Sequence, residues 1–213
     1  MLKIRWHGHS CFEVSDSHTI VTDPHDGSSI GINPPNVRAD IVLVSHDHYD
    51  HNKVKSVEKD GTLVVREGNR NIDGIDIESF REYHDPEGGA KRGEINIFKF
   101  TVDGISFCHL GDLGRVMDDD VAEKIGSVDI LFVPVGGVFT IDGGEAMEVC
   151  NKIKPRVIIP MHYKVGGLSL PIERVDDFLD KARGCCEIRY VANEIEIEKD
   201  DLPDEKEVWV FTL

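Results

Sequence analysis

Cationic residues are scarce in this sequence: its 213 residues include 24 lysines and arginines against 40 aspartates and glutamates, so the formal net charge is −16. Binding to nucleic acid depends on Lys and Arg clustered against the phosphate backbone, and adsorption to an anionic membrane depends on the same basic residues. The acidic balance therefore argues against both kinds of partner. A small-molecule partner is the expectation that remains, and no feature indicates an oligomeric state.

Cysteines and long apolar runs are also few. The five cysteines make no C-x-x-C pair, and the adjacent Cys185 and Cys186 do not form the spaced pattern of a disulfide framework. No apolar run reaches the roughly 18 residues of a membrane-spanning helix. The first seven residues, MLKIRWH, lack the apolar stretch of a signal peptide. We therefore expect a cytoplasmic protein.

The composition is that of a globular chain, with 40% hydrophobic and 30% charged residues, and the length fits one domain over residues 1–213. Apolar residues at helical spacing predict helices around 146–153 and 175–182, and shorter helices are expected over 118–125 and 52–59. Short apolar runs predict strands over 11–14, 19–22, 41–45, 62–65, 75–77, 95–102, 105–108, 128–133, 157–161, 187–191 and 208–213. The fold class is mixed α/β (α+β), with helices packed on a mostly β core.

One segment concentrates ligand-type side chains. An uncharged apolar run over residues 41–44 is followed by His46, His48, Asp50 and His51, and three histidines and two aspartates fall within the six residues 46–51. Buried charges are costly unless they pair or bind a metal, and imidazole is the commonest side-chain metal ligand. A loop after a strand is also where a scaffold presents functional groups. The cluster therefore predicts a metal site.

Three more ligand-type residues, His84, Asp112 and His162, each follow an apolar stretch elsewhere in the chain. Any one of them alone is more often a hydrogen-bonded surface residue. Because strand ends in a layered fold emerge on a common rim, we expect these three to complete the site that His46 begins.

The order His-x-His-x-Asp-His, followed by these three residues, resembles the metallo-β-lactamase superfamily. Asp23, at the end of an early apolar run, matches a further mark of that family. The segments WHGHSCF at 6–12 and PMHY at 160–163 look like the branch of L-ascorbate-6-phosphate lactonase-like proteins. The resemblance implies a four-layer αβ/βα sandwich with its site at one edge, between two sheets.

The resemblance also implies the ligands of two divalent metal ions. These would be His46, His48 and His84 for the first ion, Asp50, His51 and His162 for the second, and Asp112 as a bridge. Zinc suits the histidines, and the aspartates make manganese or iron plausible. Asp50, Asp112 and His109 are then expected to be catalytic, and Asp23 to orient a ligating histidine. His109 is expected either to support the site or to contact substrate, the alternative being a hydrogen-bonded histidine at a strand end.

Substrate contacts follow from charge. Lys91 and Arg92, soon after His84, and Lys164, soon after His162, suit an anionic substrate, although ordinary loop solubility explains them equally well. His9 is a further candidate for the site. Two ions of this kind lower the pKa of a bridging water, so the expected function is hydrolysis of a small anionic ester, lactone or phosphodiester by metal-activated hydroxide.

Other functions share parts of this pattern. A non-catalytic metal-dependent binding domain is the main alternative, although every expected ligand position is filled. Nuclease relatives share the motif but need a basic surface, which a net charge of −16 opposes. Flavin-linked di-iron relatives carry Glu where this chain has His48.

Overall fold

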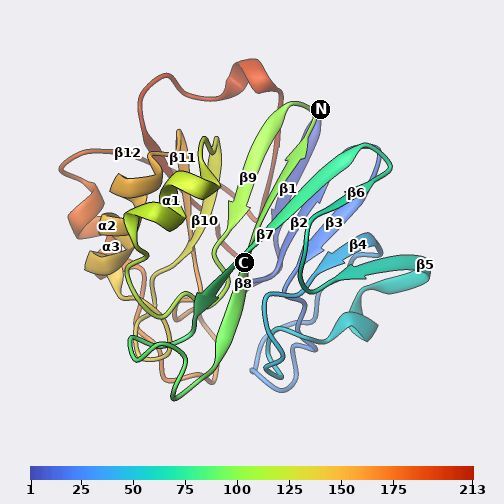
Figure 1. Ribbon diagram of the computed structural model, residues 1–213, viewed down its shortest axis with the longest axis horizontal. Coiled ribbons are helices and arrows are strands. Elements are labelled where there is room, and N and C mark those ends of the chain that lie inside the picture. Colours follow the sequence, from blue (N-terminus) through green and yellow to red (C-terminus); the bar gives the residue numbers. More distant parts are fainter.

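The computed structural model describes residues 1–213 and contains two β-sheets and three α-helices (Figure 1). The six-stranded sheet has, in order, β13 (Glu194–Ile197), β1 (Leu2–Trp6), β2 (Phe12–Ser15), β3 (Thr19–Thr22), β4 (Ala39–Leu43) and β5 (Glu58–Val65). The eight-stranded sheet has, in order, β12 (Glu187–Tyr190), β14 (Glu207–Val210), β11 (Val157–Met161), β10 (Ile130–Pro134), β9 (Ile105–His109), β8 (Glu94–Val102), β7 (Ile75–Tyr83) and β6 (Arg70–Ile72). The helices are α1 (Asp119–Ile125), α2 (Gly143–Ile153) and α3 (Asp176–Ala182), and 3₁₀ turns lie at Val54–Ser56 and Lys199–Asp201.

The main core lies between the two sheets. Phe12 of β2 and Phe132 of β10 contact each other with ring centroids 4.4 Å apart, which joins one sheet to the other. Successive side chains of a strand point to opposite faces. Along β4, Ile41 faces this core, whereas Val42 faces a smaller apolar cluster on the other side of the sheet. β4 is therefore buried on both faces, which explains its uninterrupted apolar run.

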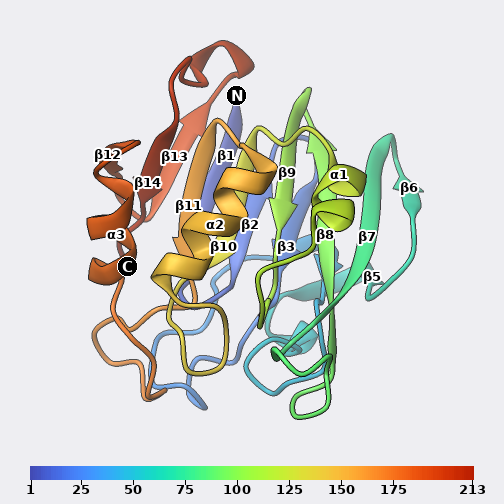
Figure 2. The same ribbon diagram turned by 60° about the vertical axis from the view of Figure 1, so that its left-hand side comes forward.

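The helices cover the outer face of the eight-stranded sheet; in Figure 2, α2 lies in front of β10 and β11, and α3 lies at the left, below β12. The apolar stripe that predicts α2 is buried, and the helix begins with a capping box in which Asp142 and Glu145 satisfy backbone N–H groups. In α3, Phe178, Leu179 and Ala182 are buried. No helix combines the length and apolar character needed to cross a membrane. The mixed α/β class is confirmed.

The helix expected over residues 52–59 is wrong. Only a 3₁₀ turn forms, at Val54–Ser56, and the chain enters β5 at Glu58. Val54 and Val57 pack with Val42 and Val44 on the outer face of the six-stranded sheet. These two valines therefore cover the sheet and do not mark one face of a helix. The chain continues as β5, the edge strand, which is parallel to β4.

Three strands, β1, β6 and β13, were not predicted. β1 carries the period-two pattern in its alternate burial of Leu2, Ile4 and Trp6, and β13 alternates isoleucine with glutamate before pairing with β1. A period-two reading of residues 2–6 would therefore have found β1 in the sequence.

Candidate metal centre

The six strands that precede the ligand-type residues end at one edge of the molecule. β1, β3 and β4 run in the same direction in the six-stranded sheet, as do β7, β9 and β11 in the eight-stranded sheet. The loops after these strands gather at the lower end of the molecule in Figures 1 and 2. They carry His9, Asp23, residues 46–51, His84, Asp112 and His162. The topology thus collects ligand-type side chains from distant parts of the chain.

The first group of nitrogens comes from His46, His48 and His84. Nδ1 of His48 lies 3.0 Å from Nε2 of His46 and 3.2 Å from Nε2 of His84. Ligand atoms around a tetrahedral zinc, with zinc–nitrogen bonds of 2.0–2.1 Å, lie about 3.3 Å apart. The three nitrogens therefore have the spacing of ligands to one ion.

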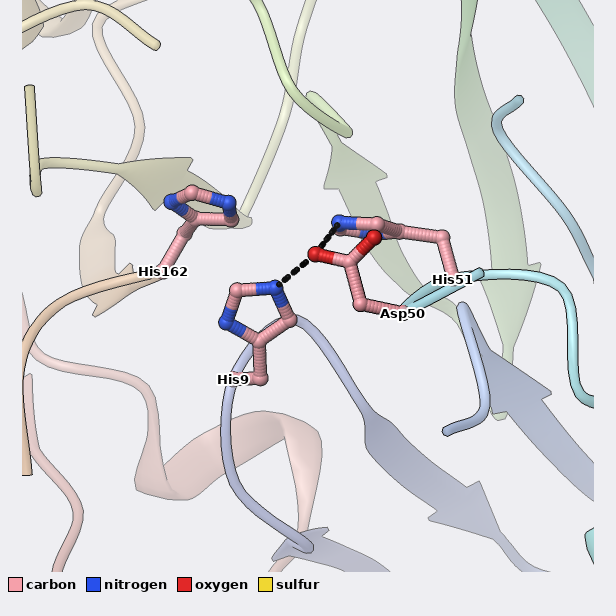
Figure 3. Close-up of side chains that lie close together, drawn as sticks. All are labelled: His9, Asp50, His51 and His162. Atoms are coloured by element: carbon pink, nitrogen blue, oxygen red, sulfur yellow. Dashed lines mark hydrogen bonds and ion pairs between the residues drawn. The ribbon is translucent and has the colours of Figure 1, made fainter. Parts of the chain in front are cut away.

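The second group is formed by Asp50, His51 and His162, with His9 beside them (Figure 3). Oδ2 of Asp50 lies 3.4 Å from Nε2 of His51. One ligand atom from each of these four residues falls within 4.8 Å of the others. This cluster is large enough to surround a second ion.

Asp112 lies between the two groups. Its Oδ2 is 3.2 Å from Nε2 of His51 and 3.3 Å from Nε2 of His162. The same oxygen is 3.4 Å from Nε2 of His84 and 3.7 Å from Nε2 of His46. One carboxylate oxygen thus contacts both groups, and the other, Oδ1, is buried without a hydrogen-bond partner. A carboxylate placed in this way could be shared by two cations, and the donors present fit a pair of metal ions.

The electrostatics of the cluster favour a cation. Burial alone would lower the pKa of His51, but Asp112, Asp23 and Asp50 outweigh it and raise this pKa well above its usual value. Burial opposes ionisation of Asp112, yet the charges of His162 and His51 hold its pKa well below the usual range. Burial lowers the pKa of His46 to about 3, so its imidazole is neutral. Ionised Asp112 and neutral His46 are already the forms that bind metals, whereas the imidazolium form of His51, which its three carboxylate neighbours favour, would release a proton to a bound cation.

Asp23 supports the site from behind. Asp23 is fully buried, and its Oδ2 lies 3.1 Å from Nδ1 of His51. The same carboxylate accepts the Ser45 backbone N–H at 2.7 Å and the Ser45 hydroxyl at 2.6 Å. A carboxylate on Nδ1 fixes the tautomer that leaves Nε2 free to bind a metal. This is the position expected of a residue that orients a ligating histidine.

Ser45 is a member of the site that sequence reasoning missed. Its Oγ lies 2.8 Å from Nδ1 of His46, so it connects that ring to Asp23. Gly111, with φ of 54°, faces Ser45, and a Cβ at Gly111 would lie 2.7 Å from the Ser45 Cβ. A glycine directly before Asp112 therefore permits this close approach. The only sign of this role in the sequence is that Ser45, a small polar residue, directly precedes the histidine cluster.

His9 was predicted to contact substrate, and the structure places it against Asp50 instead. Its side chain is fully buried and lies behind Asp50, outside the lining of the cavity. Burial and the nearby His162 lower the pKa of His9 to about 3, so the ring is neutral and donates from Nε2 to Oδ2 of Asp50 at 3.0 Å. The ring also contacts that of His162, with centroids 4.2 Å apart. His9 therefore positions Asp50.

Replacing His9 by alanine is expected to weaken metal binding by about 10- to 100-fold, the usual effect of removing a hydrogen-bond partner of a ligand. His9→Gln retains an N–H donor and should recover part of the loss. His7→Ala is the matched control, because the His7 ring contacts Glu13 at 3.1 Å and not the site. Competition with a chromogenic chelator measures the affinity. Equal affinities in His9→Ala and His7→Ala would contradict the role of His9.

His109 was predicted to be catalytic, and its surroundings argue otherwise. Its Nε2 donates to the backbone oxygen of Ser10 at 3.0 Å, and its Nδ1 accepts the Gly111 backbone N–H at 3.2 Å. Burial lowers the pKa of His109, in keeping with this neutral tautomer. Both ring nitrogens are occupied and the ring is buried. His109 therefore holds the backbone beside Asp112 and contacts neither metal position nor cavity.

The three basic residues that were predicted to contact substrate have different surroundings in the structure. The ammonium of Lys164 donates to the backbone oxygens of Leu168 and of Leu170, the latter at 2.8 Å. Lys91 pairs with Glu87 at 2.5 Å on the surface. Both lysines thus have local partners of opposite charge or dipole, and neither lines the cavity over the ligand groups. Arg92 is the predicted cation that lines the cavity.

A cavity of about 280 Å³ opens over the metal ligands. Its lining consists of His48, Asp50, His84, Asp112 and His162 from the ligand groups, together with Tyr49, Arg92, Phe139 and Leu170. The volume is that of roughly nine water molecules, at the small end of ligand pockets. The cavity therefore suits a small molecule placed directly over both ligand groups.

A model of the beta-lactamase superfamily domain matches residues 3–162 of this chain. The chain belongs to the metallo-β-lactamase superfamily. A metal-dependent hydrolase of Nitratidesulfovibrio vulgaris is 32% identical over 193 residues, which cover 76% of this chain and 80% of that protein. A crystal structure from Thermotoga maritima, described as a Zn-dependent hydrolase of the same superfamily, is 37% identical. It has a TM-score of 0.80 and covers 99% of this chain and 98% of its own.

A metal-dependent hydrolase structure from Parabacteroides distasonis, 21% identical with a TM-score of 0.70, covers 98% of this chain and 92% of its own and shares the fold. As a member of the metallo-β-lactamase superfamily with these relatives, the chain is a metal-dependent hydrolase. The superfamily resemblance read from the motif is confirmed. The lactonase-like branch stays a prediction.

Proposed function

We propose that this metallo-β-lactamase superfamily member holds two divalent metal ions and hydrolyses a small anionic ester, lactone or phosphodiester. The observation that carries the proposal is the position of Asp112, whose single oxygen lies 3.2–3.7 Å from histidines of both ligand groups. A carboxylate with this many nitrogen neighbours is placed to be shared by two cations.

The ligand sets follow from the same distances. His46, His48 and His84 would hold the first ion, Asp50, His51 and His162 the second, and Asp112 both. When bound, two such ions lower the pKa of a shared water to near neutrality and stabilise the charge that develops on the leaving oxygen. Five imidazoles among seven donors suit zinc, and the two carboxylates also suit manganese or iron.

The chain's own residues prepare this chemistry in three ways. Asp23 keeps Nε2 of His51 free for the metal, and His9 keeps Asp50 directed toward His51. The cavity over Asp50 and Asp112 places the substrate against both ligand groups. Because the ligands come from rigid strand ends in two sheets, their geometry is set before substrate binds.

Metal content tests the proposal. Protein purified without chelator and reconstituted with zinc is expected to bind about two equivalents by elemental analysis, and His48→Ala to bind about one, because only the first group loses a donor. His18→Ala is the matched control, since its ring lies on the surface beside Asp73. Hydrolysis of ester, lactone and phosphodiester probes should require the metal. One equivalent or none in the reconstituted native protein would overturn the two-metal proposal.

A further inference from the structure

The rim of the cavity is made of one cation and three apolar or aromatic side chains. Five of the nine lining residues are ligands on its floor, and the remaining four are Tyr49, Arg92, Phe139 and Leu170. These four residues are the groups that a bound molecule touches once its reacting atoms lie over the ligands. Their chemistry therefore reports on the part of the substrate that is not cleaved.

Arg92 has no carboxylate partner. Its Nη2 donates to the backbone oxygen of Val138 at 3.2 Å, and its guanidinium carbon lies 5.3 Å from the ring centroid of Phe139. By contrast, Arg115 contacts Glu82 through Nε at 3.1 Å and through Nη2 at 3.2 Å. Although the net charge of the chain is −16, the Arg92 guanidinium lines the cavity over the ligand groups without a carboxylate to neutralise it. Its free N–H groups match the two oxygens of a carboxylate or phosphate.

The loop that carries Arg92 is tied to the first ligand group. Asp85, directly after His84, is buried and accepts four backbone N–H groups. These are the N–H groups of Glu87 at 2.9 Å, Gly89 at 3.0 Å, Lys91 at 2.9 Å and Arg92 at 2.7 Å. The His84 N–H also donates to the backbone oxygen of Gly93 at 3.0 Å. Arg92 is therefore held at a set position relative to His84.

The loop that carries Phe139 is tied to the second group. A Cβ at Gly136 would lie 2.0 Å from the backbone oxygen of His162, so the two backbones pack directly together. Val138 has φ of 60°, a strained conformation for a β-branched residue, and its oxygen is the one that Arg92 binds. Arg92 and Phe139 thus form one stacked pair anchored to a ligand of each group.

We infer that the substrate joins a carboxylate or phosphate group to a flat apolar body, with Arg92 binding the anion and Phe139, Tyr49 and Leu170 contacting the body. The inference rests on the proposed function, which places the bond to be cleaved over Asp50 and Asp112. The small cavity limits the substrate to a compact molecule. A guanidinium that already lies on an aromatic face binds such a molecule without first leaving another partner.

Two uncleavable probes test recognition by itself: 4-methoxybenzoate and its neutral counterpart 4-methoxybenzamide, titrated calorimetrically into zinc-loaded protein. The native protein should bind the benzoate at least about tenfold more tightly than the benzamide, and Arg92→Gln should lose this preference. Phe139→Ala should weaken both probes. Lys91→Gln, which removes the neighbouring cation that pairs with Glu87, is the matched control and should keep the native preference.

Cleavage of 4-acetoxybenzoate, measured on the same proteins, separates the inference from the proposed function. Equal affinity of the native protein for the two methoxy probes would overturn the inference. A preference that survives in Arg92→Gln would also overturn it, because the metal ions would then be binding the anion. Native binding preference without metal-dependent cleavage of 4-acetoxybenzoate would count against ester hydrolysis and leave the recognition by Arg92 supported.

Discussion

Asp112→Asn is expected to lower kcat by at least about 10²- to 10³-fold, the scale of removing a group that stabilises charge in a transition state. Its Oδ2 is the atom that approaches histidines of both ligand groups, at 3.2–3.7 Å. The amide has nearly the same shape but no negative charge, so under the two-metal proposal it could not offset the charge of both ions. The fold should persist, because the side-chain volume is unchanged.

Kinetics and elemental analysis on the same preparation measure this result. Bound zinc should fall below the content of the native protein, and far-UV circular dichroism should be unchanged. Asp60→Asn, on the exposed edge strand β5, is the matched control for loss of one carboxylate. Native turnover in Asp112→Asn would show that the oxygen between the two groups has no part in the reaction.

Asp23→Asn is expected to weaken binding of the second metal by about 10- to 100-fold. Asp23 accepts the proton of His51 Nδ1, so in the neutral ring Nε2 is the nitrogen left to bind a metal beside Asp112 and Asp50. An asparagine amide that turns its N–H groups to His51 would instead favour the tautomer with the proton on Nε2. That proton occupies the lone pair needed by a metal.

The Ser45 hydroxyl limits how this asparagine can turn. Asp23 accepts the Ser45 backbone N–H through Oδ1 and the Ser45 hydroxyl through Oδ2. The single oxygen of asparagine can occupy only one of these two positions. Zinc affinity by chelator competition measures the effect, with Asp16→Asn on the surface as control. Unchanged affinity for the second equivalent in Asp23→Asn would contradict the proposed orientation of His51.

Part of this site was readable because its members are close in sequence. His46, His48 and His51 follow a strand that is buried on both faces, so nearness along the chain enforces nearness in space. Asp23, His84, Asp112 and His162 were readable for another reason, since each is a ligand-type residue placed just after an apolar run. Strand ends of parallel strands meet at one edge, whatever the sequence distance between them.

The residues next to the ligands were harder to predict. Lys164 follows His162 by two positions, but its ammonium turns to the backbone oxygens of Leu168 and Leu170. His109 precedes Asp112 by three positions, but both its nitrogens bind backbone groups. Long side chains choose among local partners that lie within a few ångströms. Those partners depend on the path of the loop, which residue spacing does not specify.

The sequence by itself determined which chemistry is available. It places histidines and carboxylates at the ends of apolar strands, in a chain with an acidic net charge. Only the tertiary structure decided which of these side chains join the ligand groups, which support a ligand and which line the cavity. It placed one oxygen of Asp112 between two ligand groups, His9 behind Asp50 and Arg92 on the ring of Phe139. The physical reason is that ligand type and strand pattern are local properties of the chain. Differences of a few tenths of an ångström in the distances between side chains depend on how two sheets and their loops pack together.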